Sequence, residues 1–295
     1  MNQEKSSTQY PAIFHIGIPR SGTTTIRTVL SQDSRINLCQ RCLIQTPQWY
    51  NNIDLGVKHD SVNVLSDETI VKQDGNHCYF MTTLERISRI APDAQIVVTL
   101  REQRSWLLSR YKFGIGKGTI SSSFKDWLVS PQGVDFLSIA SYSTLYKAIT
   151  LFFPKENIHL LLFEVMKNEY ERFFNDLYQI LGLSIQNLEP VAVNASFSAE
   201  VLVKKRSLNR LPFMSHRPGT GQPNLFFRVQ HRFIRELMKF AFRSSSGASS
   251  VKKQPSDIIW GDTPFFKAIE KDFRISNAEL QSLYDINLES YGYLI

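Results

Sequence analysis

The sequence is poor in cysteine and has no long hydrophobic run. Its 295 residues include three cysteines, Cys39, Cys42 and Cys78, which are too few for a disulfide scaffold. The first residues are polar and lack the hydrophobic core of a signal peptide. The longest apolar stretches, Ile96–Leu100 and Ile158–Phe163, are far too short to span a bilayer. We therefore expect a cytoplasmic protein.

The six histidines show no metal-ligand spacing, so we expect no metal site. Hydrophobic residues make up 42% of the chain and charged residues 21%, which excludes a disordered or fibrous protein. The net charge of +7 suits an anionic partner but does not choose among nucleotide, nucleic acid, glycan and membrane. Its distribution is uneven, because residues 201–255 carry twelve Lys or Arg and a single acid, Glu236.

Short apolar segments alternate with segments of helical periodicity in the first 190 residues. Strands are expected at 12–18, 61–66, 95–100 and 158–163. Helices are expected at 23–31, 78–90, 103–112, 121–128, 134–153 and 168–181. This alternation predicts an α/β fold with a central parallel sheet covered on both faces. Residues 1–190 would form this core. Residues 191–295, which show no strand pattern, would be a helical part completing the same domain, with a flexible break at 244–250.

The first motif joins the first expected strand to the first expected helix. Gly17 begins a Gly-x4-Gly pattern that ends at Gly22 and is followed by Thr-Thr, where P-loop NTPases have Lys-Ser/Thr. Backbone N–H groups here would point at one anion, helped by the helix dipole. Arg20 is the only strong cation of the loop. Hydroxyls that could add donors belong to Ser21, Thr23, Thr24 and Thr25.

The second motif is the end of the strand at 95–100. In a Mg²⁺-dependent NTPase such a strand would often end in an aspartate for the metal, but here it ends in Arg101. An arginine repels a divalent cation and attracts phosphate. Ser109 follows eight residues later in an expected helix. Together with the first loop, this pair predicts a nucleotide site for a ligand with two separated anionic groups.

The segments IPRSGTTT and LREQRSWLLSRY resemble the two cofactor motifs of sulfotransferases that use 3′-phosphoadenosine 5′-phosphosulfate (PAPS). Segments nearer the C-terminus resemble bacterial members of that family that act on glycans. The resemblance implies a P-loop-like, three-layer α/β/α fold, PAPS as co-substrate, 3′,5′-adenosine bisphosphate (PAP) as product, and no metal. It implies that Arg20 contacts the oxygen bridging phosphate and sulfate, and that Arg101 and Ser109 hold the 3′-phosphate. Gln103 replaces the proline usual in the second motif.

The general base has three candidates, Glu68, His77 and Asp67. Asp67 and Glu68 follow the strand expected at 61–66, so they should lie at the same sheet edge as Arg20 and Arg101. His77 lies near the position of the histidine that the cytosolic branch of the family uses. Their structural alternatives are a helix cap for Asp67, a first-turn residue for Glu68 and an ordinary polar group for His77. Basic residues that could close over the nucleotide are Lys204, Lys205 and Arg206.

A basic helix is expected at 224–243. One of its faces would carry Arg228, Arg232, Arg235 and Lys239. This face could be solvated, or it could contact an acidic glycan or an anionic membrane, which would place the protein at the inner face of the membrane.

The function favoured by these motifs is sulfuryl transfer to a carbohydrate or glycolipid hydroxyl, with a saccharide or lipid-linked glycan as partner and no nucleic acid. The alternatives are a P-loop kinase or NTPase and a non-enzymatic basic module that binds nucleic acid or membrane.

Overall fold

A computed structural model describes residues 10–39, 55–71, 78–191, 199–210 and 259–295 of the chain. It divides into two compact units. The first contains 1–107, 131–194 and 264–295, and the second contains 108–130 and 195–263. The last segment of the chain, 264–295, thus belongs to the first unit.

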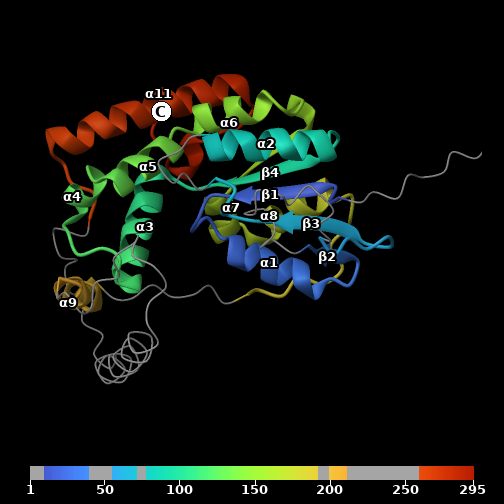
Figure 1. Cartoon of the computed structure of the whole chain (residues 1–295), viewed down its shortest axis with the longest axis horizontal. Coiled ribbons are helices and arrows are strands. Elements are labelled where there is room, and N and C mark those ends of the chain that lie inside the picture. Colours follow the sequence, from blue (N-terminus) through green and yellow to red (C-terminus); the bar gives the residue numbers. More distant parts are fainter. Residues whose placement is uncertain (1–9, 40–54, 72–77, 192–198, 211–258) are drawn as a thin grey trace, which may run out of the picture. The chain divides into compact units, whose positions relative to one another are not determined.

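The first unit is built on a five-stranded, fully parallel sheet (Figure 1). Its strands, in the spatial order β2-β3-β1-β4-β5, are β1 Ile13–Gly17, β2 Ile36–Leu38, β3 Val62–Ser66, β4 Gln95–Leu100 and β5 Ile158–Leu162. Every residue of the central strand β1 is buried, as expected for a parallel sheet covered on both faces.

Helices cover both faces of this sheet because the chain crosses it in two directions. The connection from β1 leads outward to β2, whereas the connection from β3 passes β1 to reach β4. Right-handed crossovers therefore put α1 and α2 on opposite faces. Figure 1 shows α6 and α11 alongside α2 and away from α1. These helices are α1 Thr23–Gln32, α2 Cys78–Ile90, α6 Tyr142–Thr150 and α11 Pro264–Leu283. The expected three-layer α/β/α arrangement is confirmed.

The remaining helices of this unit differ in their bounds from those expected from the sequence. They are α5 Pro131–Ile139, α7 Phe163–Asn168 and α8 Tyr170–Ile180, with single 3-10 turns at Lys155–Asn157 and Glu289–Tyr291. The single helix expected at 134–153 is wrong, because Ser141 leaves the helical region (φ −78°, ψ 83°) and separates α5 from α6. Strand β2 was not expected, since three residues are too short to carry a periodicity.

The second unit is a smaller helical body. Helix α3, Gln103–Lys117, begins in the first unit and ends here, beside α4 Phe124–Leu128 and α9 Ala199–Leu208. Tyr111 packs on Trp127 with ring centroids 5.6 Å apart, and its hydroxyl accepts a 3.0 Å hydrogen bond from the buried guanidinium of Arg206. Lys205 donates to the carbonyl of Gly116 at 2.6 Å. The expected basic helix at 224–243 and break at 244–250 lie outside the described residues.

A buried pair of amides joins α11 to the core of the first unit. Gln103 and Asn277 are both fully buried, and they exchange hydrogen bonds of 2.6 and 3.2 Å. The Asn277 amide also donates to the carbonyl of Leu294 at 2.8 Å. Gln103, which stands where the resembled motif has a proline, therefore helps to hold the C-terminal helix in place.

Replacing Asn277 with alanine should lower the free energy of unfolding by about 1–3 kcal/mol, because Gln103 would be left buried with unsatisfied polar atoms. Urea denaturation followed by circular dichroism measures this loss. Lys271→Ala, at an exposed position of the same helix, is the control and should stay within about 0.5 kcal/mol of the wild type. A wild-type midpoint for N277A would mean that the apolar face of α11 alone holds the helix.

Candidate functional site

The loop between β1 and α1 has a backbone that few sequences could adopt. Arg20 has φ 74° and Gly22 has φ 92°, both in the left-handed region. A Cβ at Gly22 would lie 1.9 Å from Cε of Met166, so the flexible end of that side chain would have to move, while the positive φ itself favours glycine. Left-handed backbone at a residue other than glycine costs about 1–3 kcal/mol and is concentrated at functional sites.

Two carbonyl groups of this loop accept hydrogen bonds from the protein itself. Ile18 O accepts from the N–H and the hydroxyl of Ser21, at 3.1 and 2.6 Å. The indole of Trp106 donates to Pro19 O at 2.6 Å. Since these acceptors face the protein, the loop can present N–H groups together with those of the first turn of α1.

The hydroxyl of Thr23 is buried and has no hydrogen-bond partner among the described residues. It lies 2.4 Å from the point where a Cβ at Gly17 would be, so the glycine makes room for it. An unpaired buried hydroxyl at the start of α1 fits an anion that supplies its missing partner. The predicted anion-binding residues therefore lie together at one loop, namely Arg20, Ser21, Gly22, Thr23, Thr24 and Thr25, with the Ser21 hydroxyl engaged within the loop.

Arg101 leaves β4 directly beside this loop. Its Nη1 donates to Arg20 O at 3.0 Å, its Nε donates to the hydroxyl of Ser105 at 3.2 Å, and its guanidinium lies 4.5 Å from the ring centroid of Phe163. Burial lowers the pKa of Arg101, although an arginine remains charged at any physiological pH. The two predicted phosphate-binding arginines are thus connected. Ser109 lies on the part of α3 that belongs to the second unit, so its pairing with Arg101 stays a prediction.

The structure distinguishes two candidate bases that are adjacent in sequence. Asp67 is 1% exposed, and its Oδ1 accepts from the N–H and hydroxyl of Thr69 at 2.8 and 2.7 Å. Its Oδ2 is buried without a partner among the described residues. Glu68 is partly exposed and lines a cavity. His77 lies outside the described residues.

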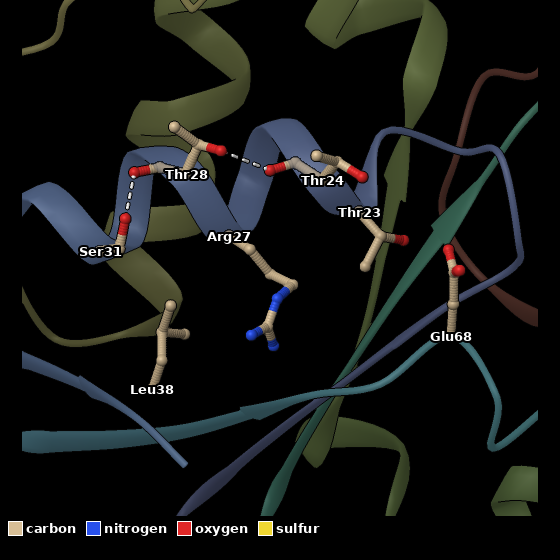
Figure 2. Close-up of a pocket in the computed structure, with 7 residues that line it drawn as sticks. All are labelled: Thr23, Thr24, Arg27, Thr28, Ser31, Leu38 and Glu68. Atoms are coloured by element: carbon tan, nitrogen blue, oxygen red, sulfur yellow. Dashed lines mark hydrogen bonds between the residues drawn. The ribbon is translucent and has the colours of Figure 1, made fainter. Parts of the chain in front are cut away.

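That cavity has a volume of about 360 Å³ and runs along α1 on the side of β2 and β3 (Figure 2). Figure 2 shows the guanidinium of Arg27 directed into it, and its Nη1 donates to Ser66 O at 2.9 Å. The lining residues are Thr23, Thr24, Arg27, Thr28, Ser31, Leu38 and Glu68.

A buried histidine connects the strands that carry all these groups. His15, on β1, is 1% exposed, and its ring nitrogens bond the hydroxyls of Ser66 on β3 and Thr99 on β4, each at 2.8 Å. Its ring is 3.2 Å from the point where a Cβ at Gly17 would be. Burial, with the nearby charge of Arg27, lowers the pKa of His15 to about 4, so the imidazole is neutral at neutral pH. Sequence reasoning missed this residue. The one feature of the sequence that could have indicated it is the presence of a histidine within an apolar strand.

Glu164 is a second residue that sequence reasoning did not select. It follows β5, and its carboxylate accepts from the N–H of Glu102 at 3.0 Å and from the hydroxyl of Tyr293 at 2.9 Å. Burial raises the pKa of Glu164. The ends of β4 and β5 and the last residues of the chain are joined through this carboxylate. The feature of the sequence that could have indicated Glu164 is a carboxylate directly after the strand expected at 158–163.

A parallel sheet with a Gly-rich loop after β1 and an arginine after β4, at the point where the connections diverge, defines a P-loop-like α/β fold. A family model described as the sulfotransferase domain matches residues 11–231. The chain therefore belongs to the sulfotransferase family and is an enzyme of that class, which decides against an NTPase and against a non-enzymatic basic module.

Comparison with solved structures found chains that are similar to this one in fold. A sulfotransferase from Alicyclobacillus acidocaldarius is similar with a TM-score of 0.56 and 15% identity, over 96% of this chain and 98% of that chain. Mouse sulfotransferase SULT7A1, solved as a complex with PAP, is 12% identical over 95% and 93% of the two chains, with a TM-score of 0.45. At such identities the likeness concerns the fold alone. A search of curated protein sequences found no match.

No described helix is long and apolar enough to cross a membrane. Within the same residues, no group of three or more His, Cys, Asp or Glu side chains could hold a metal ion.

The low pKa of His15 predicts how stability changes with pH. Unfolded, the imidazole binds a proton below about pH 6.5, whereas the folded protein resists protonation down to about pH 4. Stability should therefore rise with pH over this window, by about 3 kcal/mol from this group. Urea midpoints measured between pH 4 and 7 test this, and His15→Gln should flatten the slope.

His159→Gln is the matched control for this experiment. Burial also lowers the pKa of His159, but this side chain is only half-buried, so H159Q should retain most of the slope. If H15Q and the wild type have equal slopes, His15 does not remain neutral in the folded protein.

Proposed function

We propose that this enzyme transfers a sulfuryl group in line from PAPS to a hydroxyl of a carbohydrate or glycolipid. The observation that carries the proposal is the direct contact between its two anion motifs, since Arg101 holds the strained backbone of Arg20 in place. A ligand with a phosphosulfate at one motif and a phosphate at the other would bridge them. PAPS supplies a sulfuryl group already activated by its bond to phosphate.

Binding and charge neutralisation are the tasks of the loop. The N–H groups at the start of α1 and the hydroxyls of Thr23, Thr24 and Thr25 would hold the phosphosulfate, while Arg20 would stabilise the charge that develops on the bridging oxygen. Arg101, through its remaining donors, would hold the 3′-phosphate, with Ser109 as its partner. Group transfers of this kind depend mainly on positioning and electrostatics.

Glu68 is the general base that we favour among the three candidates. Its partial exposure and its place in the cavity wall make it accessible to an acceptor hydroxyl, whereas Asp67 is enclosed and bonded to its own turn. Asp67 and His77 remain the alternatives. A base in this position would take the proton as the hydroxyl attacks sulfur.

The acceptor and location complete the proposal. The polar cavity suits a saccharide or lipid-linked glycan better than an apolar acceptor. The basic helix that the sequence predicts at 224–243 would bring the enzyme to the anionic inner surface of the cytoplasmic membrane, where lipid-linked glycans are displayed, through Arg228, Arg232, Arg235 and Lys239.

Arginine variants test the assignment of the two motifs. Arg20→Ala should reduce kcat at least 100-fold with little change in PAP affinity, because its charge is needed most in the transition state. Arg101→Ala should weaken PAP binding by about tenfold or more, and it should also lower kcat because the backbone of Arg20 loses its anchor. Calorimetric titration with PAP in the absence of Mg²⁺, together with steady-state rates, separates the two effects. Binding of Mg²⁺-ATP but not PAP would overturn the proposal.

Replacing Glu68 with glutamine tests the base. The substitution keeps the size of the side chain but removes its proton affinity, so kcat should fall about 10²–10⁴-fold while PAP affinity stays unchanged. Glu171→Gln, at an exposed position of α8, is the control and should leave both values unaltered. Unchanged turnover in E68Q would transfer the role to His77 or Asp67, which D67N and H77N would then distinguish.

A further inference from the structure

We infer that the cavity along α1 binds the acceptor, and that Arg27 selects acceptors carrying an oxyanion, either a carboxylate or a phosphate, close to the reacting hydroxyl. This inference rests on the proposed function and adds a substrate class to it.

The position of the cavity follows from the order of the strands. Strand β1 lies between β3 and β4, so a nucleotide that spans the loop and Arg101 extends toward β4. In-line displacement requires the acceptor to approach the sulfur from the side opposite the leaving group. That side is the side of β3 and β2, where the cavity lies between α1, Leu38 and Glu68.

The hydrogen-bonding character of the walls indicates a ligand rich in hydroxyls. The Thr28 hydroxyl donates to Thr24 O at 2.9 Å, and the Ser31 hydroxyl donates to Thr28 O at 2.7 Å (Figure 2). Because both protons are used within the helix, each oxygen presents lone pairs to a ligand. The Glu68 carboxylate is an acceptor too, so the complementary ligand must donate several O–H groups. Saccharides do so, and an unsubstituted phenol offers a single hydroxyl.

Arg27 adds a fixed positive charge to this wall. Its contact with Ser66 O anchors the side chain, while Figure 2 shows its guanidinium directed into the cavity. Guanidinium groups match carboxylate and phosphate oxygens better than they match neutral hydroxyls. A cation in the wall of an acceptor site therefore favours an anionic acceptor over a neutral one.

The spacing along the helix places the oxyanion. Arg27 follows Thr23 by four residues, which is about 6 Å along the axis at 1.5 Å per residue. The reacting hydroxyl, near Glu68 and the start of α1, and the oxyanion would thus be separated by about the width of one sugar ring. The cavity volume of about 360 Å³ is near the lower end of the range for ligand sites, about 300–1,000 Å³. The cavity therefore has room for only a small part of the acceptor.

The experiment compares three matched saccharides, one with a uronate carboxylate, one with a phosphate monoester and one neutral. Their binding to the PAP complex is measured by titration, and kcat/KM is measured with PAPS. The wild type should prefer at least one anionic saccharide over the neutral one by about tenfold or more. Which of the two is preferred identifies the source of the oxyanion.

Arg27→Gln should reduce the ratio of kcat/KM for the anionic over the neutral saccharide to nearly one. Arg27→Lys keeps the charge but not the planar guanidinium, so it should give an intermediate ratio. Arg89→Gln, which removes an exposed arginine paired with Glu85 on α2, should keep the wild-type ratio. Thermal melts report whether each variant folds. If R27Q does not fold, R27K provides the test instead. A purely structural role for Arg27 would leave the preference of R27K for anionic over neutral saccharides at the wild-type value.

The possible failures are distinguishable. A wild type that binds PAP but binds neutral and anionic saccharides equally, or binds neither, overturns this inference and leaves the proposed nucleotide site intact. A preference that persists in R27Q and R27K assigns the selection to another residue and also overturns it. A wild type that does not bind PAP overturns the proposed function itself.

Discussion

The neutral imidazole of His15 is the interaction on which the site depends. It bonds the last residue of β3 and the penultimate residue of β4 from its own position on β1, so three adjacent strand ends are held at fixed spacing. Each of those strands runs directly into a part of the site. Strand β1 leads to the anion loop, β3 to Asp67 and Glu68, and β4 to Arg101. Burial disfavours the charged form of the ring, and the nearby charge of Arg27 adds to this effect, so the imidazole that joins the strands is neutral.

The loop between β1 and α1 is held in place by hydrogen bonds to its carbonyl groups. Hydrogen bonds from Trp106 and Arg101 fix the backbone of Pro19 and Arg20 from the side of β4, and they offset the strain of the left-handed Arg20. Such anchoring organises the donors before a ligand arrives, which is how electrostatic stabilisation acts without a cost of reorganisation. Arg101 therefore serves the loop as well as the phosphate that we propose it binds.

The C-terminal segment completes the first unit through buried polar contacts. Tyr293 reaches the carboxylate of Glu164 after β5, and Asn277 pairs with Gln103 at the start of α3. Both contacts are made at the carboxyl ends of strands β4 and β5, beside Arg101. Unpaired, these groups would be costly in the interior, so the polar network allows few alternative positions for the end of the chain.

The sequence by itself determined the class of fold and the place of the Gly-rich loop. Apolar strands such as β4, the Gly-rich turn at Gly17–Gly22 and the arginine after β4 are local signals, because each depends on neighbouring residues along the chain. Only the tertiary structure decided that His15 joins three strands, that Arg101 touches Arg20, and that Glu68 rather than Asp67 faces the cavity. Asp67 and Glu68 are adjacent carboxylates that follow the same expected strand. Packing against β1 and α1, which are distant along the chain, determines which one is enclosed and which can meet a ligand.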